Sequence, residues 1–182
     1  MTMNDIMAAI KNRRSVRKYD GNDVSREDEN QLLEAVRWAQ SWANTQCWEV
    51  VVVRDPAMKE KLAETVYKGN PAQKSITAAP VVFVLCAKYK SSGYYKGEVT
   101  TKFGDWFLFD MGIAAQNLCL CAHCLGIGTV VVGLFDHDKA NTVVNVPDGH
   151  EVVCMIPAGH PAKPSAAPKR KTVAEFTHYE SF

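Results

Sequence analysis

The spacing of apolar residues divides the chain into helical and extended segments. Apolar side chains recur every three or four positions in several stretches, which predicts helices there. The expected helices lie at residues 3–12, 25–40, 55–67, 72–78, 105–126 and 136–144. Continuous apolar runs predict strands at 50–53, 80–87 and 152–157, with a shorter strand within 126–133. The run at 80–87 has no polar face, so it is expected mid-sheet with both faces covered.

Two stretches depart from a simple amphipathic pattern. The predicted helix at 105–126 is apolar on nearly every side, which indicates all-round burial, either at the centre of the domain or between subunits. It also carries four polar residues that argue against a membrane span, namely Asp110, Gln116, Asn117 and His123. Residues 88–104 are polar and aromatic without periodicity, and a loop of this length in a compact domain is often functional.

Composition and charge narrow the class of protein. With 182 residues, 47% of them apolar, the chain can bury a sizeable core and is expected to form one domain over residues 1–182. The formal net charge of +1 provides no long-range field for a polyanion, so nucleic acid is not an expected partner. We find no cationic leader and no charge-free run long enough to span a bilayer, so we expect a soluble, cytoplasmic protein without membrane contact.

The six cysteines are expected to be free thiols, because no secretory leader accompanies them. Four potential metal ligands lie close together in the sequence, namely Cys119, Cys121, His123 and Cys124. On a helix, Cys119 and His123 share one face while Cys121 and Cys124 lie on another. The four groups do not converge, so no metal site is expected.

A cationic segment, Arg13-Arg14-Ser15-Val16-Arg17-Lys18-Tyr19, directly follows the first predicted helix. Guanidinium groups bind phosphate at two points, so the segment is suited to a phosphate-bearing ligand. The alternative is that cations simply gather at the C-terminal end of a helix, where the macrodipole favours them. A second basic cluster, Lys169-Arg170-Lys171, lies behind Pro168 near the other end of the chain. The two clusters together favour a shared anionic ligand.

Side-chain amides stand within residues 41–48, directly before a predicted strand. Asn44 and Gln46 each offer a donor and an acceptor, which suits the edge of a heterocyclic ring. Alternatively, these amides satisfy the backbone of their own loop. Gly126 and Gly128 do not form a dinucleotide-binding fingerprint, because that motif has a third glycine and leads into a helix, whereas this stretch leads from a helix into a strand.

In combination, these motifs resemble the FMN-dependent nitroreductase family over nearly the whole chain. The likeness rests on Arg13 to Tyr19, on 41–48 running into 50–53, on 110–128 with Gln116-Asn117-Leu118, and on Val146-Pro147-Asp148-Gly149 followed by Gly159-His160-Pro161. The resemblance implies an α+β fold with a mainly antiparallel central sheet flanked by helices. It also implies a homodimer in which a C-terminal arm, residues 161–182, packs on the partner subunit, with FMN bound at the interface.

The resemblance implies roles for particular residues as well. Arg13, Arg14, Ser15 and Arg17 would hold the FMN phosphate, and Lys169 and Arg170 would complete that site. Asn44 and Gln46 would lie at the flavin ring, and the backbone at Gly133 and Leu134 would donate an N–H toward flavin N5. The chain departs from the family pattern at Cys47, where a proline is usual, and at Val131, Val132 and Leu134.

The function implied is transfer of electrons from NADH or NADPH, by way of FMN, to a nitroaromatic, quinone or similar flat acceptor. The cofactor carries the chemistry, so no catalytic side chain is expected. With one flavin face open, donor and acceptor would take turns in a pocket beside Tyr94, Phe103 and Trp106, giving substituted-enzyme kinetics. The alternatives are a specialised family member (a flavin reductase, or a flavin-cleaving, dehalogenating or dehydrogenating enzyme) and a flavin-binding protein with little turnover.

Overall fold

The computed structural model describes residues 3–182 and centres on one four-stranded sheet. Its strands are β1 (Trp48–Val53), β2 (Val81–Lys88), β5 (Gly128–Thr129) and β6 (His150–Gly159). They lie in the order β1-β2-β6-β5, and each neighbouring pair is antiparallel. The α+β fold with a mainly antiparallel central sheet is therefore confirmed.

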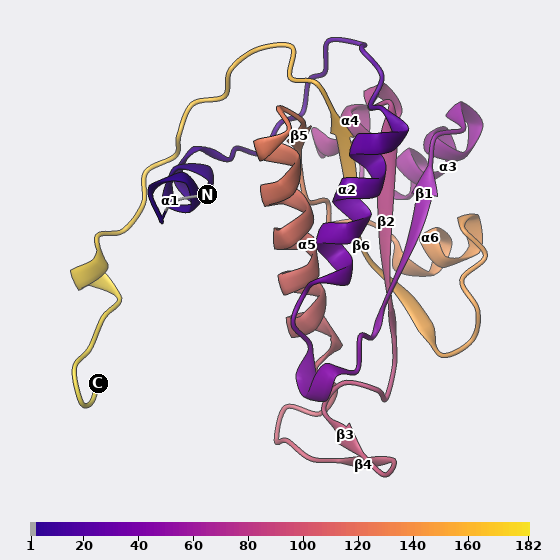
Figure 1. Ribbon diagram of the computed structural model, residues 1–182. Coiled ribbons are helices and arrows are strands. Elements are labelled where there is room, and N and C mark those ends of the chain that lie inside the picture. The colour runs from indigo at the N-terminus through magenta and orange to yellow at the C-terminus, as the bar shows by residue number, and fades with distance from the viewer. Residues whose placement is uncertain (1–2) are drawn as a thin grey trace.

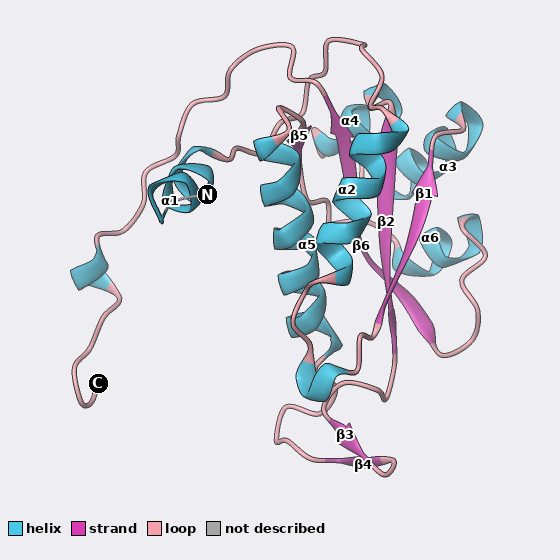
Figure 2. Ribbon diagram, in the orientation of Figure 1, coloured by secondary structure: helices cyan, strands magenta, loops and turns pink. Residues whose placement is uncertain are grey.

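Helices cover both faces of this sheet (Figures 1 and 2). One face carries α2 (Arg26–Arg37) and α5 (Phe107–Cys124), and the other carries α3 (Pro56–Thr65), α4 (Ala72–Ala78) and α6 (His137–Val143). Alternate residues of β2 enter the two resulting cores, with Phe83 and Leu85 on the α5 side and Val82 and Val84 on the α3 side. The prediction that 80–87 forms a strand covered on both faces is confirmed.

The predicted helices are present, but several are shorter than expected. The helix expected at 25–40 ends at Arg37, and its start is fixed because Ser25 accepts a hydrogen bond from the Asp28 N–H. The stretch at 88–104 contains a small hairpin of β3 (Tyr94–Tyr95) and β4 (Glu98–Val99). A 3-10 turn, η1 (Trp42–Asn44), precedes β1.

The expectation that α5 is buried on every side is wrong for the single chain. One side of α5 packs into the core through residues such as Met111, Ala114 and Leu118. On the other side, Leu108 and Phe109 remain 64% and 61% exposed. By length and composition α5 is apolar enough to cross a membrane, but its buried side makes it a core helix of this fold. Within one chain the helix is therefore buried on one side only, and burial of its other side between subunits stays a prediction.

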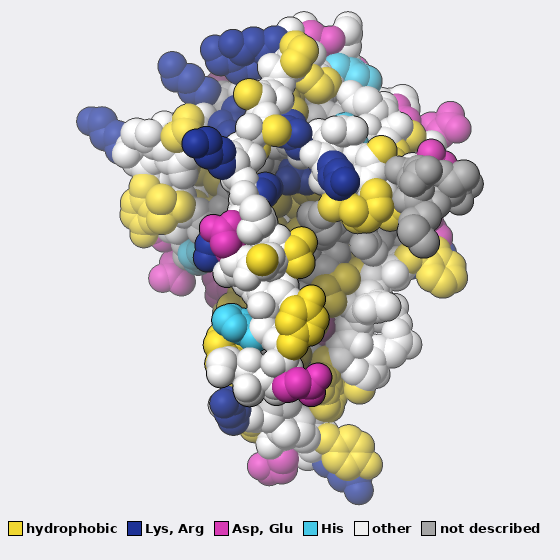
Figure 3. All heavy atoms as spheres, turned by 90° about the vertical axis from the view of Figure 1, so that its left-hand side faces the viewer, with side chains coloured by type: hydrophobic (Ala, Val, Ile, Leu, Met, Phe, Trp, Pro, Cys, Tyr) yellow, Lys and Arg dark blue, Asp and Glu magenta, His cyan; other side chains and the backbone are white. Residues whose placement is uncertain are grey.

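The N-terminal helix and the C-terminal arm lie on the same side of α5, away from the sheet (Figure 1). Helix α1 (Met3–Asn12) exposes Ile6 and Ile10, and the arm forms only a short 3-10 turn, η2 (Val173–Glu175). Four large apolar side chains of the arm are exposed, namely Val173, Phe176, Tyr179 and Phe182. Figure 3 shows this side of the molecule, where Lys and Arg gather over the upper part and hydrophobic side chains are scattered below.

Candidate functional site

The cationic segment is fixed against the edge of the sheet directly after α1. The Val16 N–H donates to the Thr129 carbonyl over 2.8 Å, and Ser15 forms a parallel bridge with Thr129. This approach requires glycine at 128, since a Cβ there would lie 2.6 Å from the Val16 Cβ. The positions of Ser15 and its neighbours are thus set by packing against β5.

The start of the C-terminal arm returns to the cationic segment. Ala162 N–H donates to the Lys18 carbonyl over 3.0 Å, and Asp20 N–H donates to the His160 carbonyl over 3.0 Å. The arm then passes the cationic segment and encloses a cavity of about 300 Å³, called here the cationic cavity. Its lining consists of Arg13, Arg14, Ser15, Arg17, Ser165, Ala166, Pro168 and Arg170. The structure therefore brings the two basic clusters together within one chain, with Arg170 but not Lys169 in the lining.

The arginines of this cavity differ in what they already bind. Arg14 donates to the carbonyls of Lys11 and Arg13 over 2.6 and 2.8 Å, so it stabilises the C-terminal end of α1 as the helix-end alternative expected. Within residues 3–182, Arg13, Arg17 and Arg170 make no hydrogen bond through the guanidinium and no ion pair. These three charges are available to an anion.

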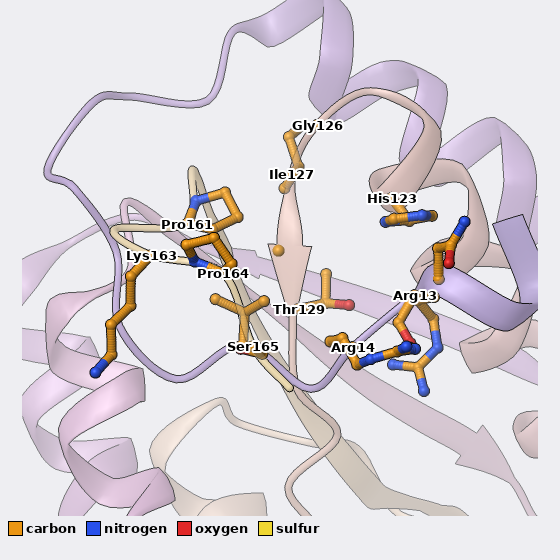
Figure 4. Close-up of a pocket in the computed structure, with 13 residues that line it drawn as sticks. Arg13, Arg14, His123, Gly126, Ile127, Thr129, Pro161, Lys163, Pro164 and Ser165 are labelled. Atoms are coloured by element: carbon orange, nitrogen blue, oxygen red, sulfur yellow. The ribbon is translucent and has the colours of Figure 1, made fainter. Parts of the chain in front are cut away.

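A second cavity, of about 310 Å³, adjoins the cationic cavity and shares Arg13, Arg14 and Ser165 with it (Figure 4). In the close-up, Thr129 lies beside Arg14, and His123 of α5 stands above both arginines. Thr129 is 1% exposed, and its hydroxyl lies beside the Cys119 thiol of α5, which is a weak hydrogen-bond partner. The hydroxyl makes no stronger hydrogen bond within the described residues, so it is a further polar group in the lining of this cavity.

A larger cavity, of about 760 Å³, adjoins the cationic cavity through Arg17. Its polar lining includes Lys18, Asn70, Gln73 and Lys74. Asn70 and Lys74 were not predicted from the sequence, although the turn Gly69-Asn70-Pro71 directly before a helix was a local signal for exposed polar groups. These residues provide amide and cationic groups beside Arg17.

Gly133 and Leu134 lie exposed next to the sheet edge, just after Val132 pairs with Met155. The backbone N–H groups of Gly133 and Leu134 have no hydrogen-bond acceptor within residues 3–182. The next residue, Phe135, forms an antiparallel bridge with Val66. Two backbone donors are therefore available at this exposed edge, although Gly133 and Leu134 do not line the cavity of about 760 Å³.

Asn44 and Gln46 are exposed on a turn that a buried carboxylate holds. The backbone N–H of Trp42 donates to both oxygens of Asp110, over 3.1 and 3.2 Å. The two side-chain amides bond one another, with Gln46 Nε2 donating to Asn44 Oδ1 over 3.3 Å. Neither side chain bonds the backbone within the described residues, so the backbone-satisfying alternative is wrong here. Burial and the Asp110 carboxylate raise the pKa of the neighbouring Cys47 thiol to about 12.

The cationic cavity and the amide turn lie at opposite ends of α5. The second cavity, which shares Arg13 and Arg14 with the cationic one, is lined by His123 in the last turn of this helix, whereas the amide turn bonds Asp110 in its first turn. A helix of 18 residues is about 27 Å long. One chain alone therefore does not bring Asn44 and Gln46 to the arginines.

Of the three aromatic residues predicted to line the substrate pocket, Phe103 and Trp106 lie close together and Tyr94 does not join them. The rings of Phe103 and Trp106 lie 6.3 Å apart, and those of Trp106 and Phe109 lie 5.1 Å apart. With Asp105 and Leu108, these three residues line an open, mostly apolar cavity of about 390 Å³ at the N-terminal end of α5. Tyr94 lies in β3 and is not part of that lining.

An antiparallel sheet with helices on both faces and a cationic cavity closed by the arm defines the class of protein. The nitroreductase family model matches residues 10–75 and 67–160, so the chain belongs to the nitroreductase family of oxidoreductases.

Individual relatives agree with this family assignment. A Methanothermobacter thermautotrophicus protein, provisionally named NADH dehydrogenase/NAD(P)H nitroreductase, is 30% identical over 163 residues, covering 87% of this chain and 78% of its own. The Bacillus subtilis FMN reductase [NAD(P)H] is 28% identical over 191 residues, covering 99% of this chain and 75% of its own. The structure of an FMN-dependent nitroreductase from Clostridium difficile superposes with a TM-score of 0.82 at 24% identity, covering 97% and 99% of the two chains.

Proposed function

We propose that the protein is an FMN-dependent oxidoreductase that takes electrons from NADH or NADPH and passes them to a nitroaromatic, quinone or similar flat acceptor. The observation that carries the proposal is the cationic cavity, where Arg13, Ser15 and Arg17 meet Arg170 from the other end of the chain. The names of the relatives support both the nicotinamide donor and the flavin, since one is an FMN reductase that uses NAD(P)H and another an FMN-dependent nitroreductase.

The residues present fit FMN. Three guanidinium groups without acidic partners would hold the phosphate, and the Thr129 hydroxyl offers a further polar contact beside them. Lys169 lies next to Arg170 and would add positive charge near the same site. The larger cavity beyond Arg17 would take the ring system, with the Asn70 amide available to its polar edge.

The protein's own groups would position and tune the flavin ring. Bound FMN would supply the hydride and electron transfer. The N–H groups of Gly133 and Leu134 would donate toward flavin N5, and Asn44 and Gln46 would bond the polar edge of the ring. Lys74 would stabilise negative charge near the ring by electrostatic attraction.

We further propose that two copies of the chain build each site. The amide turn and the cationic cavity lie at opposite ends of α5, so an antiparallel partner would bring the turn of one subunit to the arginines of the other. The exposed Leu108 and Phe109, and the apolar side chains of residues 161–182, would be covered in such a dimer. Obligate interfaces of this kind bury roughly 2,000 Å² or more.

The apolar cavity with Phe103 and Trp106 would then face the flavin region and accept flat molecules. Nicotinamide and acceptor would occupy this space in turn, because the sequence has no separate dinucleotide-binding fingerprint. Tyr94 would lie at its margin and influence the choice of acceptor.

The experiment is to purify the protein and identify what it binds. We expect yellow protein that releases FMN rather than FAD on denaturation, and NAD(P)H oxidation that continues when menadione or a nitroaromatic is supplied. Colourless protein that does not take up added FMN would contradict the cofactor proposal. FMN binding without sustained oxidation of either nicotinamide would leave a flavin-binding protein instead of an enzyme.

A further inference from the structure

Asp110 occupies a buried position where two separate loops meet. It lies in the first turn of α5 and is 1% exposed. The Trp42 N–H donates to its carboxylate over 3.1 and 3.2 Å, which holds the amide turn. The Ser92 hydroxyl donates to Oδ2 over 2.6 Å, and the Cys47 thiol lies 3.7 Å from the same oxygen. Within the described residues, the hydrogen bonds to this carboxylate come from the loop before β1 and from the loop that carries the hairpin.

We propose that Asp110 is a positioning residue that holds the amide turn and the aromatic loop in one fixed arrangement. Its importance for turnover rests on the proposed function, in which Asn44 and Gln46 contact the flavin and residues 94–106 line the acceptor pocket. Asp110 touches neither ligand in this scheme. It acts through the two loops, and a single carboxylate sets their relative position.

The amide turn needs an anchor because its backbone is unfavourable by itself. Ala43, Asn44 and Gln46 have φ angles of 45°, 56° and 49°, in the left-handed region that non-glycine residues rarely occupy. The other backbone N–H groups of the turn bond within it, from Asn44 to the Ser41 carbonyl over 3.1 Å, from Thr45 to the Trp42 carbonyl over 3.0 Å and from Gln46 to the Ser41 hydroxyl over 2.9 Å. These bonds shape the turn but do not attach it to α5. The bond from Trp42 to the buried carboxylate is charge-assisted and is therefore the strong one.

The aromatic loop depends on the same carboxylate through Ser92, which is fully buried. The Ser92 carbonyl accepts from the Trp106 N–H over 3.0 Å, so the serine connects Asp110 to an aromatic residue of the acceptor pocket. Gly93 follows at once, and a Cβ there would lie 2.6 Å from the Gly104 carbonyl, which shows how closely the two ends of this loop approach. Displacement of Ser92 would therefore move Trp106 as well.

The test begins with the protein freed of flavin and measures backbone amide exchange. In Asp110→Ala we expect exchange at Trp42 and at Trp106 to accelerate about tenfold or more, as the loss of a charge-assisted hydrogen bond implies. Ser92→Ala should accelerate exchange at Trp106 and leave Trp42 within about twofold. Asp110→Asn keeps one oxygen for the Trp42 N–H, and its NH2 group can donate to the Ser92 hydroxyl. Exchange at Trp42 and Trp106 should therefore accelerate less in Asp110→Asn than in Asp110→Ala.

A matched control is Glu29→Gln, which alters another buried carboxylate, on α2, that pairs with Arg54. It should lower the melting temperature without accelerating exchange selectively at Trp42 or Trp106. If Asp110→Ala raises exchange at these two amides no more than Glu29→Gln does, Asp110 is an ordinary core residue. Equal acceleration of Trp42 and Trp106 in Ser92→Ala would overturn the separate anchoring of the two loops. Should Asp110→Ala fail to fold, the Asp110→Asn and Ser92→Ala pair still decides between these outcomes.

The protein loaded with FMN supplies the functional readout. Ser92→Ala should raise the KM for the acceptor several-fold at nearly unchanged kcat and FMN affinity, whereas Asp110→Ala should also weaken FMN binding. If the wild-type protein takes up no FMN, the proposed function fails, yet the exchange experiment still decides the role of Asp110. If wild-type turnover is normal and Asp110→Ala changes only the melting temperature, the inference fails and the proposed function stands.

Discussion

Gly128 connects the packing of the sheet edge to the position of the arginines. The glycine lies in β5 next to Val16, where an added Cβ would meet Val16 Cβ, Cγ2 and Cγ1 at 2.6, 2.7 and 2.8 Å. Ordinary van der Waals contact begins at 3.4 Å, so Gly128→Ala would increase the separation between β5 and the segment around Val16 by about 0.8 Å. The segment that has to move carries Ser15 and Arg17.

The magnitude follows from this geometry. Overpacking of a buried contact costs about 1 to 3 kcal/mol. The Val16 N–H to Thr129 carbonyl bond, now 2.8 Å, would lengthen beyond the usual range as well. For a chain of this size, we expect Gly128→Ala to lower the melting temperature by about 2 to 12 °C. FMN affinity should also fall, because the cationic segment would no longer meet Arg170 at the same spacing.

Differential scanning calorimetry without flavin and titration with FMN measure the two effects separately. Gly149→Ala is the matched control, because a Cβ at this turn glycine meets no atom within 4 Å and only its φ of 81° opposes a side chain. The substitution should lower the melting temperature through backbone strain of about 1 to 2 kcal/mol and leave FMN affinity unchanged. If Gly128→Ala melts like wild type and binds FMN equally well, the proposed link between β5 packing and the anion site is refuted.

Five further outcomes are expected. Arg17→Ala should weaken FMN binding about tenfold or more in equilibrium titration, through loss of a charge-assisted pair; unchanged affinity would remove Arg17 from the phosphate site. Deletion from Pro161 onward should abolish both FMN binding and dimer formation, and a stable flavin-loaded monomer in light scattering would contradict the shared site. Initial rates should give parallel double-reciprocal lines, and Phe103→Ala should alter acceptor preference more than FMN content, whereas intersecting lines would exclude a shared pocket. Iodoacetamide at pH 8 should label the exposed Cys124 but not the buried Cys47, whose pKa of about 12 keeps it a neutral thiol at pH 8. Detection of labelled Cys47 by mass spectrometry would show that its surroundings open.

The fold could be predicted wherever a local pattern decided the structure. A run without a polar face required cover on both sides, and alternate residues of β2 do enter two separate cores. The expectation for α5 left two locations open, because apolar composition does not distinguish burial within one chain from burial between subunits. Leu108 and Phe109 are of residue types that usually lie in a core, and yet they are exposed in the single chain.

The site could be predicted only in part, because long-range contacts assemble it. The residue types of the cationic segment were informative by themselves, but the approach of Arg170 depends on Ala162 pairing with Lys18. No local pattern encodes that pairing across the chain. The left-handed backbone at Ala43 likewise had no sequence signal, since alanine does not favour it.

The placement of the arginines and the amide turn at opposite ends of α5 has a consequence for mixtures of chains. If each site takes its arginines from one subunit and its amides from the other, Arg17→Ala and Asn44→Ala impair different halves. A mixed dimer of the two variants would contain one site with both halves intact and one with both impaired. If equal amounts of the two weakly active variants are unfolded and refolded together, about half of the dimers would be mixed, and about a quarter of all sites would be intact. Sites built within a single subunit do not give such complementation between chains. It would arise here because α5 separates the arginines from the amide turn within each subunit.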